Sequence, residues 1–342
     1  MSRAVLLVNL GSPDSTAVQD VRRYLNQFLM DPCVIDLPWP LRRILVSAFV
    51  LPTRPAKSAE AYASVWRPEG SPLKVISQQL TDEVNDRTPL PVALAMRYGN
   101  PSMEQELLKL SALEGIEEIL LMPLYPHYAM SSVKTCILEA ERVITVHNLP
   151  QKLIVHPVFY KDPDYIRCLV DSAQPQLNEL KNGQWDHLLF SYHGVPERHI
   201  RKDDSTGQHC LSENCCNRPS KAHATCYRHQ VFATTRAFVQ EAELPDNCWS
   251  LAFQSRLGRA KWLEPATDQT IRELAQKGVK RLLVICPAFT VDCLETLEEI
   301  GIRAKEDFIA HGGEELRLIP CLNATPQWAE TLVRWLETCQ PA

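Results

Sequence analysis

The sequence predicts an α/β protein of two similar halves, each a four-stranded parallel sheet flanked by helices, with both halves facing a central cleft. Eight short apolar runs are bounded by turn residues, a pattern typical of strands buried on both faces of a sheet. Helical segments alternate with these runs, as the crossover connections of a parallel sheet require. The expected strands are 4–10, 92–96, 118–122, 153–156, 187–191, 249–253, 281–286 and 316–319.

A faint internal repeat supports the division into two halves. Residues 103–126 and 270–289 both have the order helix, glycine, strand, proline and aromatic loop. Ligands usually occupy the cleft between two such domains. We therefore expect a first domain over residues 1–150 and a second over residues 151–315, with residues 316–342 packing back on the first domain.

Composition narrows the class of protein. The chain has 342 residues, of which 45% are apolar and 23% are charged, as in soluble globular proteins. Its net charge of −5 gives no reason to expect a nucleic-acid partner. The sequence lacks a secretory signal pattern and an apolar stretch long enough to span a membrane. We expect a cytoplasmic protein whose twelve cysteines are thiols or metal ligands and not disulfides.

An apolar segment at residues 38–52 lies between prolines and contains Arg42 and Arg43. It follows a helical stretch that ends near Met30. One interpretation of this segment is a core helix. The other is a hydrophobic lip that touches a membrane surface or an apolar substrate.

Polar side chains follow most of the expected strands. Because ligands bind beyond the carboxyl ends of parallel strands, these side chains predict a cleft with a polar rim. The central candidate is His193, which follows the run 187–191 and precedes a Gly-Val-Pro turn. Imidazole is suited to moving protons near neutral pH, although a structural histidine gives the same pattern. The other strand-end residues are Asn9, Arg97, Tyr98, Tyr125, His156, Gln254, Ser255, Arg256 and residues 287–290.

A row of carboxylates follows the run 281–286. Asp292, Glu295 and Glu299 are spaced i, i+3 and i+7, which places them on one face of a helix. Glu298 falls off that face, and we expect it in solvent. The carboxylate face can pass a divalent cation from site to site or carry protons away. A solvated helix face is the alternative.

A cysteine-rich insertion over about residues 201–229 has few apolar residues and cannot hold itself together by packing. Metal coordination by thiolates is an economical clamp for such a segment. Three possibilities follow for this insertion: it binds one [2Fe–2S] cluster, it binds one zinc ion, or it is a loop without a metal. Adjacent cysteines depart from the usual CxxC spacing of zinc sites. The candidate ligands are Cys210, Cys215, Cys216 and Cys226.

Six motifs in order along the chain resemble the ferrochelatase family, whose members insert ferrous iron into a porphyrin to make haem. They are VLLVNLGSPDS, MRYGNPS, PLYPHYAMSS, SYHGVPERH, FQSRLGRAKWLEPATDQTI and FTVDCLETLEEI. The resemblance implies a fold of two Rossmann-like domains. It also implies two substrates, Fe²⁺ and a porphyrin, which we expect to be protoporphyrin IX. A GxGxxG phosphate loop is missing from the sequence, so a nucleotide cofactor is not implied.

The resemblance also assigns residues by matching position. His193 matches the family's active-site histidine, Glu295 its partner glutamate and Glu299 its second carboxylate. We expect the substrate Fe²⁺ to meet these three and Asp292. The residues expected around the porphyrin are Arg97, Tyr98, Tyr125, Ser131 and Trp262.

The sequence departs from the animal members of the family. Cys293 stands where they carry a histidine, and Met130 stands where they carry an internal cluster cysteine. Some bacterial members have four cysteines in an insertion after the histidine motif, which this chain resembles. The resemblance thus favours a [2Fe–2S] cluster with a structural or sensory role. It also permits peripheral contact with the inner face of the membrane through residues 38–52.

Three other functions compete with this interpretation. They are a cobalt chelatase of the same architecture, a non-catalytic haem or iron sensor, and a nicotinamide oxidoreductase. The choice between protoporphyrin IX and a coproporphyrin, the face of metal entry and the oligomeric state are left open by the sequence.

Overall fold

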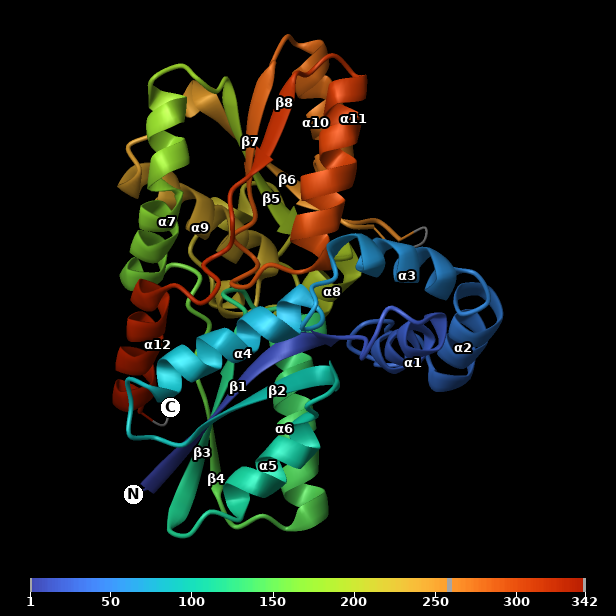
Figure 1. The fold of residues 1–342 in the computed structure, drawn as a ribbon, viewed down its shortest axis with the longest axis vertical. Coiled ribbons are helices and arrows are strands. Elements are labelled where there is room, and N and C mark those ends of the chain that lie inside the picture. The colour runs from blue at the N-terminus through green and yellow to red at the C-terminus, as the bar shows by residue number, and fades with distance from the viewer. Residues whose placement is uncertain (1, 257–259, 341–342) are drawn as a thin grey trace. The chain divides into compact units, whose positions relative to one another are not determined.

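The computed structural model describes residues 2–256 and 260–340. The chain falls into two compact units, each with its own sheet and core (Figure 1). Unit 1 consists of Met1–Leu124, Met130–Pro157 and Asn323–Ala342, and unit 2 of Tyr125–Ala129 and Val158–Leu322.

Unit 1 is built on a four-stranded parallel sheet with the order β2-β1-β3-β4. The central strand β1 is apolar and fully buried from Ala4 to Val8, as a strand covered on both faces must be. Helices α4 and α12 pack together, as do α5 and α6. The strands are β1 (Ser2–Ser12), β2 (Val92–Gly99), β3 (Ile116–Pro123) and β4 (Lys152–Val155). The helices are α1 (Val18–Leu29), α2 (Trp39–Ile44), α3 (Arg54–Val65), α4 (Pro72–Asn85), α5 (Met103–Ser111), α6 (Thr135–His147) and α12 (Pro326–Thr338), with π-helices η1 (Leu45–Val50) and η2 (Met130–Lys134).

Unit 2 repeats this layout with the strand order β6-β5-β7-β8, again all parallel. Here α7 packs against α9, and α10 against α11. The strands are β5 (His187–His193), β6 (Trp249–Gln254), β7 (Arg281–Ile285) and β8 (Glu315–Leu318). The helices are α7 (Pro163–Lys181), α8 (Glu197–Lys202), α9 (Tyr227–Glu241), α10 (Thr267–Gln276) and α11 (Lys305–Ala310), with the π-helix η6 (Glu295–Ala304) and short 3₁₀ turns η3 (Cys215–Asn217), η4 (Lys221–Ala224) and η5 (Asp246–Cys248).

The two sheets confirm the predicted fold class, and each of the eight predicted runs overlaps an observed strand. The identical strand orders give a structural basis for the repeat seen in the sequence. The predicted division after residue 150 falls before β4, whereas β4 belongs to unit 1 because it pairs with β3. Likewise β8 belongs to unit 2, and unit 1 resumes at Asn323. Arg3 donates to the carbonyls of Leu336 and Cys339 and so ties the last helix to β1.

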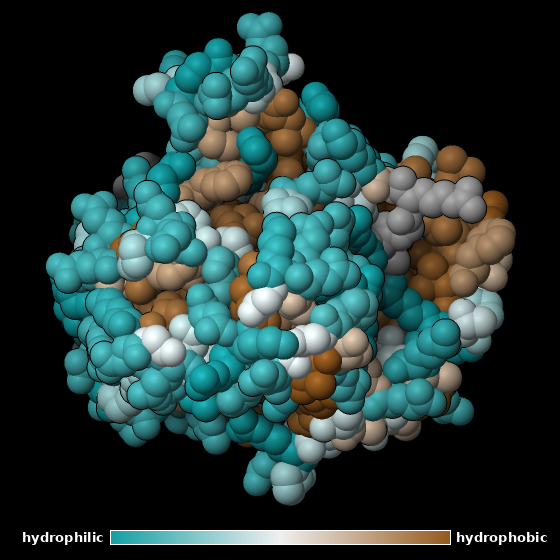
Figure 2. Space-filling view, turned by 90° about the horizontal axis from the view of Figure 1, so that it is seen from above, coloured by the Kyte–Doolittle hydropathy of each residue, from teal (hydrophilic) through white to brown (hydrophobic). Residues whose placement is uncertain are grey.

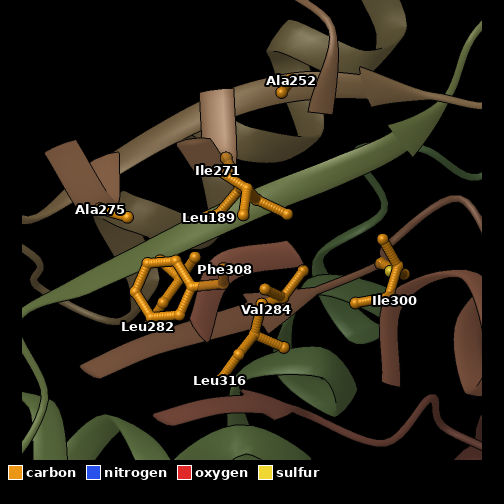
Figure 3. Close-up of a cluster of buried hydrophobic side chains, with 10 residues drawn as sticks. Leu189, Ala252, Ile271, Ala275, Leu282, Val284, Ile300, Phe308 and Leu316 are labelled. Atoms are coloured by element: carbon orange, nitrogen blue, oxygen red, sulfur yellow. The ribbon is translucent and has the colours of Figure 1, made fainter. Parts of the chain in front are cut away.

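The core of unit 2 holds β5 and β7 in register. Leu189 on β5 packs with Leu282 and Val284 on β7, and Phe308 closes the cluster from α11 (Figure 3). All four side chains are fully buried. Because the strands are fixed along their length, the polar residues at their carboxyl ends are fixed as well.

The apolar segment between prolines forms α2 (Trp39–Ile44) and η1 (Leu45–Val50). Trp39 is 62% exposed and Phe49 is 70% exposed, and Figure 2 shows apolar surface on the side where Figure 1 draws α2. Arg42 is buried instead and donates to two backbone carbonyls. The core-helix interpretation is therefore wrong. Within the described ranges, no helix combines the length and apolar character of a membrane span.

Candidate active site

His193 ends strand β5, and one hydrogen bond orients its ring. Its Nδ1 lies 2.7 Å from the carbonyl oxygen of Gly194. Because a carbonyl oxygen only accepts, Nδ1 carries the proton, and the neutral ring then has its lone pair on Nε2. The hydroxyl of Tyr227 donates to the backbone carbonyl of His193 at 2.8 Å. The ring is half-buried, and the Nδ1 hydrogen bond fixes its orientation at the end of β5.

The turn after His193 is tightly packed. The Gly194 amide donates to the carbonyl of Gln254 at 2.7 Å. A Cβ on Gly194 would lie 2.9 Å from that carbonyl oxygen and 3.3 Å from the ring of Trp262, so only glycine fits without a shift. Pro196 and Trp262 also form a backbone bridge. The predicted porphyrin residue Trp262 therefore lies against the histidine turn.

Glu299 is the carboxylate with the most strongly perturbed surroundings in this site. Burial raises its pKa first, and the negative charge of Glu295 raises it further. The Ser255 hydroxyl donates to Glu299 at 2.5 Å, and the Arg303 guanidinium lies 3.3 Å away. These two groups and His193 oppose the rise. His193, Glu295 and Glu299 thus form one electrostatically coupled group within unit 2.

Gln254 connects the strand ends to the carboxylates, a role that sequence reasoning missed. Its amide oxygen accepts from the Ser191 hydroxyl at 2.7 Å, and its Nε2 donates to the Glu295 carbonyl at 3.1 Å. The next residue, Ser255, has a φ of +59°, which few residues other than glycine adopt. Backbone strain of this kind is common where a side chain must be aimed at a site. Here it accompanies the hydrogen bond to Glu299.

The predicted acidic face is wrong in two respects. Asp292 is 5% exposed and lies before the helix, where it accepts from the Thr296 hydroxyl and the Cys321 amide. Glu298 is buried and bonded by both oxygens to Arg303 at 2.8 and 2.9 Å, so it is not solvated. Asp292 departs because the helix begins only after it, and Glu298 departs because residues 295–304 form a π-helix, whose period differs from the 3.6 residues on which the prediction relied.

In unit 1, Arg97 and Tyr98 join a buried network around Asp31. One oxygen of Asp31 accepts from Arg97 Nη2 at 2.6 Å, from the Tyr98 hydroxyl at 2.9 Å and from the Thr135 hydroxyl at 2.6 Å. Arg97 Nε donates to Thr135 as well. Burial and the charge of Asp31 hold the pKa of Tyr98 well above its usual range. Sequence reasoning did not single out Asp31, which orients both predicted porphyrin residues.

The aromatic loop after β3 is shared between the units. Tyr125 belongs to unit 2, and Ser131 lies in η2 of unit 1. Between them, His127 is buried with its Nε2 2.8 Å from the Thr234 hydroxyl, and burial lowers its pKa to about 3. His127 is therefore neutral and has a packing role.

The four insertion cysteines are all buried. The sulfurs of Cys215 and Cys216 are 3.9 Å apart, and the thiols of Cys210 and Cys226 are hydrogen-bonded to each other. Burial raises the pKa of Cys216 to about 12, against the opposing charge of Arg228. Among residues 2–256 and 260–340, no three His, Cys, Asp or Glu side chains converge on one metal-ion position.

Comparison with known proteins decides the family. The sequence profile of the Ferrochelatase family matches residues 2–339. A ferrochelatase of Stutzerimonas stutzeri (strain A1501) is 56% identical over 335 residues, covering 97% of this chain and 96% of that protein. A ferrochelatase of Pseudomonas fluorescens (strain Pf0-1) is 56% identical over 337 residues, covering 98% and 97%. This chain belongs to the ferrochelatase family.

Membership confirms the expected enzyme class, a ferrochelatase that inserts iron into a porphyrin in haem biosynthesis. SirB from Bacillus subtilis with Fe³⁺ shares the fold at a TM-score of 0.55 and 12% identity, covering 99% of this chain and 96% of that chain. This likeness concerns the fold alone. Because the chain belongs to the ferrochelatase family, the competing cobalt chelatase and nicotinamide oxidoreductase are not supported. Of the motif at 253–271, residues 257–259 lie outside the described residues.

Replacing Ser255 by alanine tests the coupling in this ferrochelatase site. The hydroxyl stabilises the ionised form of Glu299, so its loss makes the carboxyl keep its proton to higher pH. We expect the acidic limb of the pH profile of iron insertion to move up by about one pH unit, the equivalent of one hydrogen bond to a charged group.

The matched control is Ser172→Ala, whose hydroxyl donates to the Leu169 carbonyl in α7. Its pH profile should equal that of the wild type. An acidic limb that stays in place in Ser255→Ala would show that Glu299 does not titrate in the reaction.

Proposed function

We propose that this ferrochelatase uses Fe²⁺ and protoporphyrin IX, with His193 as the acceptor of the pyrrole protons. The observation that carries the proposal is the hydrogen bond from His193 Nδ1 to the Gly194 carbonyl. It leaves the lone pair of Nε2 for a proton, and two coupled carboxylates lie in the same unit. A neutral imidazole is the side chain best matched to this task near pH 7.

Metal insertion requires the loss of two pyrrole protons for each Fe²⁺ that enters the ring. In a flat macrocycle the nitrogen lone pairs are poorly exposed, so binding energy spent on bending the ring lowers the barrier. His193 Nε2 takes a proton from a pyrrole nitrogen and passes it to Glu295. Glu299 then takes it onward, and its raised pKa suits a carboxyl that both accepts and releases protons.

Glu295 and Glu299 are also suitable oxygen ligands for the incoming Fe²⁺ when they are ionised. Asp292 has a different part in this proposal. Its carboxylate is occupied by Thr296 and the Cys321 amide, so it fixes the start of η6 and does not bind the metal. The carboxylate row is thereby shortened to two residues.

The residues proposed to contact the porphyrin are those that the family resemblance assigns. Trp262 offers an aromatic face beside the histidine turn. Arg97, held by Asp31, offers a guanidinium for a propionate. Tyr125 and Ser131 complete the proposed set, whereas the predicted contact Tyr98 is 1% exposed and bonded to Asp31, so it positions that carboxylate and does not touch the porphyrin.

Replacement of His193 by alanine tests the proton acceptor. We expect iron insertion to fall by at least about 10²-fold, the usual contribution of a general base. Porphyrin binding, followed by quenching of its fluorescence, should persist because the base is not needed for it. His311→Ala is the control, since His311 is an exposed histidine that bonds the Asp307 carbonyl. Near-normal turnover in a folded His193→Ala protein would overturn the assignment.

We also propose that the insertion holds a [2Fe–2S] cluster through Cys210, Cys215, Cys216 and Cys226. The sulfurs lie as two pairs, and the 3.9 Å separation of Cys215 and Cys216 is close to the roughly 3.8 Å between two thiolates on one tetrahedral metal ion. Two pairs suit two irons better than a single zinc. When bound, the cluster supplies a covalent clamp for a segment that lacks a core of its own.

Protein purified without oxygen should contain about two irons and two sulfides per chain and show visible cluster absorption. Cys216→Ser should lose both the iron and the absorption and melt at a lower temperature. Cys248→Ser, which changes a half-buried cysteine outside the insertion, should keep them. One zinc per chain, or a metal-free insertion in the wild type, would refute the cluster.

The exposed apolar residues of α2 and η1 are proposed to bind the surface of an anionic membrane. Trp39 and Phe49 project apolar area, and the exposed Arg43 adds positive charge beside them. Flotation with vesicles of phosphatidylglycerol and phosphatidylcholine should recover the wild type. The double variant Trp39→Ser and Phe49→Ser should lose most of that binding. Val146→Ser, which removes an equally exposed apolar side chain on α6, should not. Equal recovery of all three proteins would refute the lip.

A further inference from the structure

The sulfur pair of Cys215 and Cys216 faces a positive charge that the reaction does not use. Arg228 Nη1 lies 3.7 Å from the Cys215 sulfur and 3.4 Å from the Cys216 sulfur. This inference rests on the proposed [2Fe–2S] cluster. We infer that Arg228 stabilises the negative charge of the cluster at the Cys215–Cys216 edge and so raises the reduction potential of the cluster. Hydrogen bonds to the sulfurs and nearby charge are general determinants of such potentials.

The position of Arg228 is unfavourable unless anions face it. It is the second residue of α9, where the helix dipole disfavours a positive charge. Its guanidinium is half-buried and lies over the Phe232 ring at 5.1 Å. Arg228 thus loses hydration and lies unfavourably in the helix dipole. Its Nη1 donates to the sulfurs of Cys215 and Cys216. Ionised sulfurs of a bound cluster compensate both costs.

The helix itself adds to this positive environment. Cys226 immediately precedes α9, which runs for 15 residues to Glu241. The amides of the first turn lack helical partners and present partial positive charge. The Cys210–Cys226 pair therefore meets the dipole of α9, and the Cys215–Cys216 pair meets Arg228.

One edge of the pair also lines a cavity. Cys216 and Arg228 both border a cavity of about 460 Å³, together with Arg236 from two turns further along α9. Greater exposure to solvent favours the more negative, reduced form of a cluster. The cavity and Arg228 therefore act in the same direction.

The sign of the effect follows from charge. A [2Fe–2S] cluster with four thiolate ligands carries about two negative charges when oxidised and one more after it takes an electron from dithionite. The guanidinium stabilises the reduced form more than the oxidised form. Removing the positive charge must therefore make the reduction potential more negative.

The experiment is a dithionite titration with redox mediators, followed by visible absorption and electron paramagnetic resonance, on the complete chain purified without oxygen. Arg228→Gln removes the charge, and Arg228→Lys keeps it as a single point charge. Arg236→Gln removes a cation of the same cavity that bonds Asn217. We expect a negative shift for Arg228→Gln and a smaller one for Arg228→Lys. Arg236→Gln should have a clearly smaller shift than Arg228→Gln.

Each other outcome has a separate meaning. Equal potentials in wild type and Arg228→Gln, both with full cluster content, would overturn the role of Arg228 and leave the cluster intact. Cluster loss in Arg228→Gln with retention in Arg228→Lys supports the charge. Cluster loss in both variants would overturn it in favour of a structural role. A wild type without cluster would refute the proposed cluster and this inference together.

Discussion

The side chain of Gln254 connects the parts of the second unit that chemistry requires to be close. Gln254 is the last residue of β6. Its side-chain amide accepts from the hydroxyl of Ser191 on β5 and donates to the carbonyl of Glu295 at the start of η6. All of this occurs in a buried setting, where satisfied polar networks rigidify and unsatisfied ones are costly. Because His193 ends β5 and Glu295 begins η6, this one amide fixes the spacing of the histidine and the carboxylate that we propose to exchange protons. The strained φ of Ser255, directly after Gln254, then aims a hydroxyl at Glu299.

The fold was predictable because parallel strands leave a strong mark in sequence. Each of the eight strands is a short apolar run that ends at a turn residue, and the repeat between residues 103–126 and 270–289 reflects two sheets of the same strand order. The position of His193 at the end of β5 was predictable for the same reason, and its role as a candidate site residue rests on the rule that ligands bind beyond the carboxyl ends of parallel strands. Local sequence patterns were enough for these features because their geometry is set by local periodicity.

The carboxylate row was only partly predictable, because it depends on one contact distant in sequence and on an unusual helix geometry. Asp292 accepts from the amide of Cys321, which is 29 residues further along the chain. Glu298 is bonded to Arg303 within the π-helix itself. A spacing rule for an α-helix cannot anticipate a π-helix, whose wider turn changes which side chains share a face. In the same way, Asp31 lies 66 residues before Arg97, and no motif links them. Its role follows from a single oxygen that accepts three hydrogen bonds in a buried site.

Electrostatics provides an argument on whether the insertion is a metal site, as we propose, or an empty loop. Four buried thiols are inexpensive while they are protonated, and burial raises the pKa values of Cys210, Cys216 and Cys226 accordingly. A positive guanidinium against two neutral thiols is different, because Arg228 gives up hydration for weak sulfur acceptors. That arrangement becomes favourable when metal binding removes the thiol protons and leaves negative sulfurs. The placement of Arg228 is thus an argument for a metal-loaded insertion that is independent of the cysteine spacing.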